Sequence, residues 1–218
     1  MRAEYTFNGP ILRVKFTPAL DEGSENARGI EMVGSVLEIR LSSGMKAELI
    51  HKDHLALITI LSVHPFVKSE LYIDLEVSSD FAISTAECVT YNVHFNGING
   101  EVYSPTERSK PCLAFSGGVD STAALMLMPK NTVCAWLDRP QITERTLYNK
   151  TAAKHTMNYA QGLGYDVHKI YCDVEHLRKP VGFPVDLTSG MASVAIASQS
   201  DVDSIAFGMV MELSLIHI

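Results

Sequence analysis

The sequence predicts an α/β protein with an open, mostly parallel, doubly wound sheet, preceded by a smaller α+β domain. Two observations support this fold class. From residue 111 onward, short apolar runs alternate with helical patterns, which is typical of parallel strands joined by right-handed crossovers. Residues 1–108 show no such alternation, although the chain of 218 residues is 46% apolar and can bury a sizeable core. We place the domain boundary within FNGINGEVYSPTERSKP, residues 95–111, because glycine, proline and charge gather there without periodicity.

In the N-terminal domain, residues 1–108, the clearest pattern is that of strands with one exposed face. Residues 10–16 and 35–41 alternate apolar with polar side chains, which suits antiparallel strands, and residues 70–77 form a third strand candidate. A buried helix through HLALITILSV is expected to be capped by Asp53 and to stop just before a proline.

Two features of this domain stay open. The segment 80–89 is either a helix capped by Ser79 or a strand favoured by its β-branched residues. The domain also matches no functional motif. Substrate binding, contacts within a homodimer and cover for a sheet edge are the roles that we consider for it.

In the C-terminal domain, residues 109–212, strands and helices alternate. Strands are expected at 112–115, 131–137, 166–172 and 204–208, and helices at 121–128, 143–162 and 191–199. The longest helix has an apolar stripe at Ala153, Met157 and Ala160. Thr143 and Glu144 suit its start, Gly164 suits its exit, and Ser189 is expected to cap the last helix.

The charge of the chain favours a small-molecule partner. Its 25 acidic and 18 basic residues give a net charge of −7, which argues against a surface built for nucleic acid or an anionic membrane. No apolar window reaches the roughly 18 residues of a membrane span, and MRAEYTFNGP lacks the apolar core of a secretory signal. We therefore expect a cytoplasmic protein.

Cysteines and histidines give little support for a metal or redox site. The four cysteines, Cys88, Cys112, Cys134 and Cys172, form no C-x-x-C pair. Three of the four lie in or beside apolar strands, where a buried reduced thiol is expected. His51 and His54 could share a helix face, but no third ligand is evident.

The last six residues, LSLIHI, look like the translation of an adapter used in preparing sequencing libraries. We therefore treat residues 213–218 as a non-native tail and expect the natural chain to continue beyond Glu212, with its C-terminal part missing here. A natural apolar strand is the alternative that the composition leaves open.

The most specific stretch of the sequence is LAFSGGVDSTAALMLMP, which begins at residue 113. It places a small polar loop between a buried strand and a helix, where ligands bind in open parallel sheets. Gly117 and Gly118 allow positive φ and a close approach, while amide N–H groups and the helix dipole favour an anion. The loop has neither the lysine of G-x-x-x-x-G-K-[ST] nor the G-x-G-x-x-G spacing nor a G-x-S-x-G serine. Hydroxyl donors come from Ser116, Ser121 and Thr122.

The stretch AFSGGVDSTAAL resembles the pyrophosphate loop of the N-type ATP pyrophosphatases. This group includes GMP synthetase, NAD synthetase, asparagine synthetase, tRNA thiolation and lysidine enzymes, and 7-cyano-7-deazaguanine synthase. The resemblance covers roughly residues 111–208, with the loop as its one highly specific motif. It implies a Rossmann-like sheet of the HUP type, with ATP and Mg²⁺ as cofactors. It also implies transfer of AMP to a carbonyl or carboxylate oxygen, followed by displacement by nitrogen or sulfur.

The same resemblance implies residue roles. Asp120 would brace the loop by accepting backbone N–H bonds, which we favour, or help to place Mg²⁺, and with Arg139 it is a catalytic candidate. Arg139 could reach a phosphate or a substrate carboxylate, and Asp138 would contact adenosine; a solvated pair flanking Pro140 is the alternative. The nucleotide would be held by Ser116, Gly117, Gly118, Val119 through its N–H, Asp120, Ser121 and Thr122.

Weaker candidates follow the later strands. Asp173 and Gly208 end the third and fourth strands of this domain and could line the pocket. Lys150, Lys154 and His155 lie on the long helix, where a solvated face explains them more simply. The additional basic residues that members of the group usually carry later in the chain are not found.

The loop predicts an ATP-dependent, AMP-forming enzyme that adenylates an acceptor, releases pyrophosphate and completes an amidation or a thiolation. The acceptor is expected to be a small molecule, and tRNA is left open although the net charge does not favour it. The alternative is a non-catalytic module of the same superfamily that binds AMP or ATP. A sulfonucleotide reductase is a third interpretation, but Val119 stands where that group tends to carry lysine.

Overall fold

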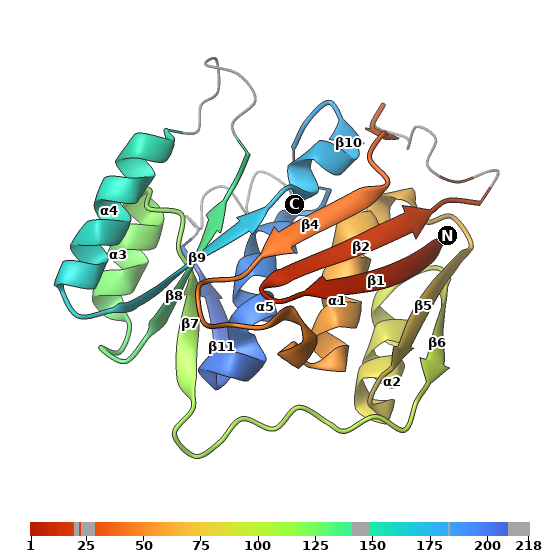
Figure 1. Cartoon of the computed structure of the whole chain (residues 1–218), viewed down its shortest axis with the longest axis horizontal. Coiled ribbons are helices and arrows are strands. Elements are labelled where there is room, and N and C mark those ends of the chain that lie inside the picture. Colours follow the sequence, from red (N-terminus) through yellow and green to blue (C-terminus); the bar gives the residue numbers. More distant parts are fainter. Residues whose placement is uncertain (20–21, 23–28, 141–148, 183, 209–218) are drawn as a thin grey trace.

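The computed structural model describes residues 1–19, 22, 29–140, 149–182 and 184–208. Its described strands form one nine-stranded sheet and one two-stranded sheet (Figure 1). In spatial order the large sheet contains β11 (Val202–Phe207), β7 (Lys110–Ala114), β8 (Val133–Asp138), β9 (Asp166–Cys172), β4 (Val36–Arg40), β2 (Ile11–Thr17), β1 (Arg2–Asn8), β5 (Glu70–Glu76) and β6 (Asn92–Gly97). The small sheet pairs β10 (Arg178–Lys179) with β3 (Glu31–Met32). The predicted mixed α/β class with a mostly parallel sheet is confirmed.

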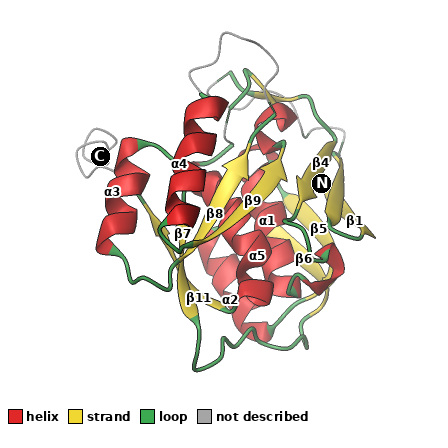
Figure 2. Cartoon of the chain, turned by 60° about the vertical axis from the view of Figure 1, so that its left-hand side comes forward, coloured by secondary structure: helices red, strands yellow, loops and turns green. Residues whose placement is uncertain are grey.

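The four strands β9, β8, β7 and β11 are parallel to one another and are covered on both faces. One face packs against α3 (Val119–Leu127) and α4 (Lys150–Gly162) in a cluster around Trp136 and Met157. The opposite face packs against α5 (Met191–Ser200), as the two views in Figures 1 and 2 show. The sheet is therefore wound on both sides in this part of the chain.

The other five strands are covered on one face only. There, α1 (Lys52–Val63) and α2 (Ser79–Cys88) lie behind the sheet, and the other face is open (Figure 1). Burial alternates accordingly along β2, where Val14 and Phe16 are buried and Arg13 and Lys15 are exposed. Short 3-10 helices complete the described elements: η1 (Ala47–Leu49), η2 (His64–Phe66), η3 (Val174–Leu177) and η4 (Asp186–Gly190).

The two halves of the chain meet within the large sheet. β4 pairs antiparallel with β9 through Ile39↔Cys172 and Arg40↔Tyr171. α1 packs against α5, and one apolar core contains side chains from both halves. The expected boundary at residue 108 does not interrupt the sheet. The division into an N-terminal and a nucleotide-binding domain, like the HUP type of the fold, stays a prediction.

The predicted strands and helices are present where the structure describes them, with bounds that shift by up to two residues except at one helix start. The helix expected over 143–162 begins only at Lys150, because Asn149 has an extended backbone and is its N-cap, so the predicted start at Thr143 and Glu144 is wrong. Thr143 and Glu144 lie outside the described residues, and so does the tail 213–218. Gly164 leaves α4 with φ +88° as expected. The strands β1 and β6 were not predicted, and the open segment 80–89 belongs to a helix. No helix among the described ranges has the length and apolarity to cross a bilayer.

Three predicted caps are wrong. α1 is capped by His51, whose Nδ1 accepts a hydrogen bond from the Asp53 N–H at 3.2 Å. Asp53 is buried and instead accepts from the N–H and the hydroxyl of Ser78, at 2.8 and 2.7 Å. Ser78, not Ser79, caps α2, since its Oγ accepts from Phe81. The third wrong cap is Ser189: it lies within η4, and Gly190 directly precedes α5.

Candidate functional site

The loop SGGVDS lies at the carboxyl end of β7, where the winding of the sheet reverses. From β7 the chain passes through α3 to β8 and through α4 to β9, always toward the same side. After α5 on the opposite face, β11 returns to the other side of β7. A reversal of this kind leaves a crevice at the strand ends, which is where open α/β sheets bind ligands.

The backbone of the loop turns sharply into α3. The Phe115 N–H donates to the Ala135 carbonyl at 2.9 Å and completes the strand pairing. Gly117 has φ +76°, a conformation that favours glycine, and Gly118 is the N-cap with φ −78° and ψ 172°. No side chain in the described part of the chain caps α3. The first-turn amides are therefore left to point outward, as in anion-binding helix starts.

Hydroxyl groups brace this loop from within. The buried Ser121 Oγ, 2% exposed, donates to the Gly118 carbonyl at 3.1 Å and lies 3.0 Å from the Ser116 Oγ. Thr122 Oγ1 donates to the same carbonyl at 2.8 Å, and the Gly118 N–H donates to Ser116 Oγ at 3.3 Å. These hydroxyls were expected to face a ligand, but this geometry uses them to hold the turn.

Asp120 does not brace the loop as expected. Its side chain is exposed on the first turn of α3, and it has no hydrogen bond or ion pair with any described residue. Val119 beside it is 84% exposed, so that only its backbone contributes to the turn. The carboxylate at the helix start is thus open to solvent, and its contact with Mg²⁺ remains the other predicted role.

Two glycines let the surrounding backbone approach the loop. A Cβ on Gly117 would lie 3.2 Å from the Ala153 Cα in α4. A Cβ on Gly208, directly after β11, would lie 2.4 Å from the Ser121 Cα and 2.7 Å from its N. The contact at Gly117 would be tight, and the contacts at Gly208 are closer than real Cβ atoms come to backbone. Gly208 was predicted to line the pocket. In the structure, its lack of a side chain lets the start of α3 pack directly against the end of β11.

A pocket of about 390 Å³ opens beside the loop. Asn149 belongs to its wall and also caps α4, since its Oδ1 accepts from the Ala152 N–H at 2.9 Å. A smaller pocket of about 40 Å³ shares Ser116 and Arg139 and adds Ser189. The loop therefore faces open space beside a cationic side chain. The larger pocket is lined by Ser116, Gly117, Gly118, Arg139, Asn149, Ala152 and Ala153.

The charged residues after β8 are held in ion pairs. Asp138 is 4% exposed, and its two oxygens lie 2.7 Å from Lys150 Nζ and 3.1 Å from Lys169 Nζ. Arg139 pairs with Glu175 at 3.0 Å while it lines both pockets. The interpretation of Asp138 and Arg139 as a solvated pair is wrong, and so is that of Lys150 as a free surface lysine. The predicted contact of Asp138 with adenosine stays a prediction.

The remaining candidates lie apart from the loop. Asp173 accepts a hydrogen bond from the Glu38 N–H at 2.8 Å and thereby joins the end of β9 to β4. Burial raises the pKa of this carboxyl, and Asp173 belongs to neither pocket beside the loop. Lys154 and His155 are exposed on α4, as expected.

Thiols and imidazoles form no metal centre in the described residues, where no group of three or more potential ligands occurs. Cys112, Cys134 and Cys172 are buried and free as predicted, and burial raises their pKa values to about 11, 12 and 12. The rings of His51 and His54 lie 5.6 Å apart, and burial lowers the pKa of His54 to about 4.

Sequence reasoning missed Asn149 and Lys169, and it named Ser189 only as a helix cap and not as a pocket residue. Asn149 had a usable signal, because asparagine is a strong N-cap and the apolar stripe of α4 begins four residues later. The role of Lys169 depends on the register Trp136↔Lys169 between β8 and β9, which brings its side chain to Asp138. The sequence alone does not contain that register.

We compared the chain with protein-family models, with curated proteins and with solved structures, and none of the three comparisons gave a match. The functional assignment therefore rests on the residues and on their geometry.

Proposed function

We propose that the chain binds ATP with Mg²⁺ at the SGGVDS loop and belongs to an ATP-dependent, AMP-forming enzyme that adenylates a small-molecule acceptor. The observation that carries the proposal is the uncapped start of α3, which faces a pocket of about 390 Å³ at the point where the sheet reverses. The β and γ phosphates would lie against the amides of the loop, with Gly117 and Gly118 free of side-chain obstruction.

The chemistry of the loop suits a departing diphosphate. In the proposed step an acceptor oxygen attacks the α phosphorus, and the bond to the α–β bridging oxygen breaks. The electron pair of that bond leaves with pyrophosphate. Fixed N–H dipoles stabilise such growing charge with little reorganisation, and Arg139 adds a cation at the pocket wall. Bound Mg²⁺ would neutralise the phosphates further.

Asp120 is the residue that we propose for Mg²⁺. Mg²⁺ is usually held by one or two carboxylates together with substrate phosphates. The Asp120 carboxylate lies at the helix start and is not used by other described residues, whereas Ser121 and Thr122 already brace the turn. This division of roles is the opposite of the bracing role that we favoured for Asp120 from the sequence.

One observation favours the second candidate function, a nucleotide-binding module without turnover. Among the described residues, Arg139 of the pocket wall is paired with Glu175, and Lys150, which follows Asn149 of that wall, is paired with Asp138. An adenylating site needs a cation that is free to neutralise the negative charge that develops on the transferred phosphate. Unless ligand binding releases one of these pairs, the described residues would hold a nucleotide more readily than they would activate it.

The test measures binding and products separately. Calorimetry with ATP and Mg²⁺ should give binding to this chain that inorganic pyrophosphate competes away, and Asp120→Asn should weaken the response to Mg²⁺. With candidate acceptors, the enzyme should release AMP and pyrophosphate. Binding without any exchange of pyrophosphate into ATP would support the module instead. Release of ADP and phosphate, or absence of nucleotide binding, would refute the proposal.

A further inference from the structure

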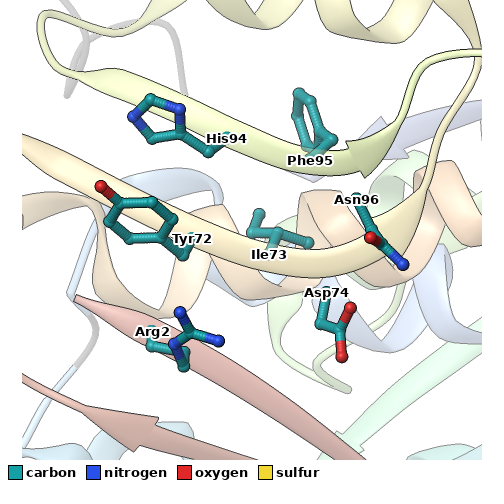
Figure 3. A pocket seen from close by; sticks show the side chains of 7 residues that line it. All are labelled: Arg2, Tyr72, Ile73, Asp74, His94, Phe95 and Asn96. Carbon is teal, nitrogen blue, oxygen red and sulfur yellow. The ribbon is translucent and has the colours of Figure 1, made fainter.

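A second polar pocket lies near the opposite end of the large sheet from the loop. It has a volume of about 180 Å³ and sits on the open face of β1, β5 and β6 (Figure 3). This volume is below the roughly 300 Å³ at which pockets for drug-sized ligands begin, so the pocket suits a small molecule. Its lining residues are Arg2, Tyr72, Ile73, Asp74, His94, Phe95 and Asn96.

The pocket lies where the sheet splits. The pairing of β1 with β5 ends at Ala3↔Ile73. Between β5 and β6 the register passes from Ile73↔Phe95 to Glu76↔Gly97, so that β5 carries one extra residue there. Such bulges bend a strand and redirect a side chain, and they are frequent beside binding sites. Asp74 stands at this irregularity, released from regular pairing on both sides.

One wall of the pocket is a preassembled row across three strands. Arg2, Tyr72 and His94 occupy matching register positions, and Figure 3 shows Tyr72 between the other two. The rings of Tyr72 and His94 are stacked with centroids 4.6 Å apart, and the Arg2 guanidinium lies 5.7 Å from the tyrosine centroid. Glu70 holds the middle member of this row in place, because its Oε2 accepts a hydrogen bond from the Tyr72 hydroxyl at 2.5 Å.

The other wall carries polar groups without a partner. Asp74 and Asn96 lie next to each other on β5 and β6, on the side of the pocket away from Arg2, Tyr72 and His94 (Figure 3). Neither side chain makes a hydrogen bond or an ion pair with any described residue. Glu38, a carboxylate elsewhere on this open face, is paired with Arg13 and Arg40. The pocket thus has hydrogen-bond acceptors on one side, from Asp74 and Asn96, and the cation of Arg2 on the other side.

These walls restrict the class of ligand. Tyr72 already has His94 on one side and Arg2 on the other, so it offers no free side on which a nucleobase could stack. The guanidinium of Arg2 suits a carboxylate, while Asp74 and the amide oxygen of Asn96 suit an ammonium group. Arg2 and Asp74 both line the pocket, and no ion pair joins them.

We propose that this pocket binds a free α-amino acid, with its carboxylate at Arg2 and its ammonium group at Asp74 and Asn96. The site is independent of the nucleotide site proposed above, because it shares no residue with it and lies near the other end of the sheet. An amino acid fits both the small volume and the two opposed charges, whereas a simple amine or a simple acid would use only one wall.

The experiment uses ligand-observed saturation-transfer NMR and calorimetry on the intact chain. The probes are glycine, leucine, arginine and glutamate, each compared with its N-acetyl derivative and its amide. At least one free amino acid should bind, and both blocked forms should bind about tenfold more weakly, since each loses one charged contact. Asp74→Asn and Arg2→Gln should each weaken binding about tenfold. Asp80→Asn, an exposed carboxylate on α2 outside the pocket, is the matched control and should change nothing.

Several results would overturn the inference. One is absence of binding by every free amino acid at millimolar concentration. Another is equal binding by the N-acetyl derivatives, which lack the ammonium charge. Binding that survives Asp74→Asn but is lost in Gly117→Val would place the amino acid at the loop pocket and would refute this site. Near-ultraviolet circular dichroism of Asp74→Asn verifies that the isosteric change leaves the packing intact.

Discussion

The two ends of the large sheet build their polar pockets from different parts of the chain. At the end of β7 the site is made of backbone: one short loop provides the turn, the amides and the close contacts with α4 and β11. On β1, β5 and β6 the pocket is made of side chains that come from three strands. The first kind of site leaves a motif in the sequence, and the second leaves none.

This difference also separates the residues that matter at each end. At the loop, substitutions should act through the space that they fill, because the glycines have no side chain to lose. On the open face, they should act through the charge that they remove. The following predictions test that contrast, beginning with the largest effect.

Gly117→Val should be the most damaging change at the loop. The positive φ costs a β-branched residue about 1–2 kcal/mol, and contact with the Ala153 backbone adds about 1–3 kcal/mol. Urea denaturation should therefore show a loss of about 3 kcal/mol or more, and nucleotide binding should disappear. Gly164→Val is the matched control, since it has φ +88° with nothing within 4 Å. Equal losses in the two variants would mean that packing against α4 is unimportant.

His54 should give the N-terminal half an acid-sensitive stability. Burial, aided by the charge of His51, lowers the pKa of His54 from its ordinary value of 6.5 to about 4, although Asp53 acts in the opposite direction. Because the unfolded chain then takes up the proton first, stability is complete above about pH 7. It should fall by about 3 kcal/mol as the pH decreases from 6.5 to 4.

Unfolding in urea at a series of pH values measures this slope. His54→Gln should flatten it, whatever it does to the absolute stability. His155→Gln removes an exposed imidazole on α4 and should leave the slope unchanged. An unchanged slope in His54→Gln would show that this ring titrates alike in the folded and unfolded chain.

Gly208→Ala should destabilise the chain by about 1–3 kcal/mol. The added methyl group meets the backbone of Ser121, which cannot rotate away, so the start of α3 must shift. Thermal unfolding and nucleotide affinity should both report the shift. Gly162→Ala near the end of α4 has open space around it and should be neutral or slightly stabilising. If both glycines tolerate alanine, the seating of α3 on β11 is looser than described.

Val119→Ala should have the smallest effect. The side chain is 84% exposed and the backbone N–H is retained, so nucleotide affinity should change less than about twofold, within the usual range of surface substitutions. Calorimetry with ATP and Mg²⁺ is sufficient to decide. A large loss would mean that the valine side chain itself contacts the ligand, contrary to a site built from backbone.

Sequence patterns predicted the elements well where side-chain periodicity was strong. The runs at 131–137 and 166–172 lie within buried or half-buried strands, and Ala153 and Met157 mark the inner face of α4. The strand β1 was missed although its inward residues Ala3, Tyr5 and Phe7 alternate with exposed polar residues, so its pattern was available in the sequence. β6 was missed because Asn92 and Asn96 resemble turn residues.

The candidate site was predictable only in part. The position of the loop followed from a strand, two glycines and a helix in succession. The partners of Asp138 did not, because Lys150 and Lys169 reach it through the packing of α4 and the register of β9. The bracing role of Ser121 was equally hidden, since it depends on which way a hydroxyl points within one turn.

The close seating of Gly208 against α3 has a consequence for insertions and deletions. With the start of β11 paired as it is, a one-residue insertion between Val202 and Phe207 would move the large Phe207 side chain into the position of Gly208, where even a Cβ would meet the Ser121 backbone. Length changes in β11 should thus be far less tolerated than most substitutions in it. The number of residues between Asp201 and Gly208 therefore determines whether glycine meets the start of α3 beside the crevice.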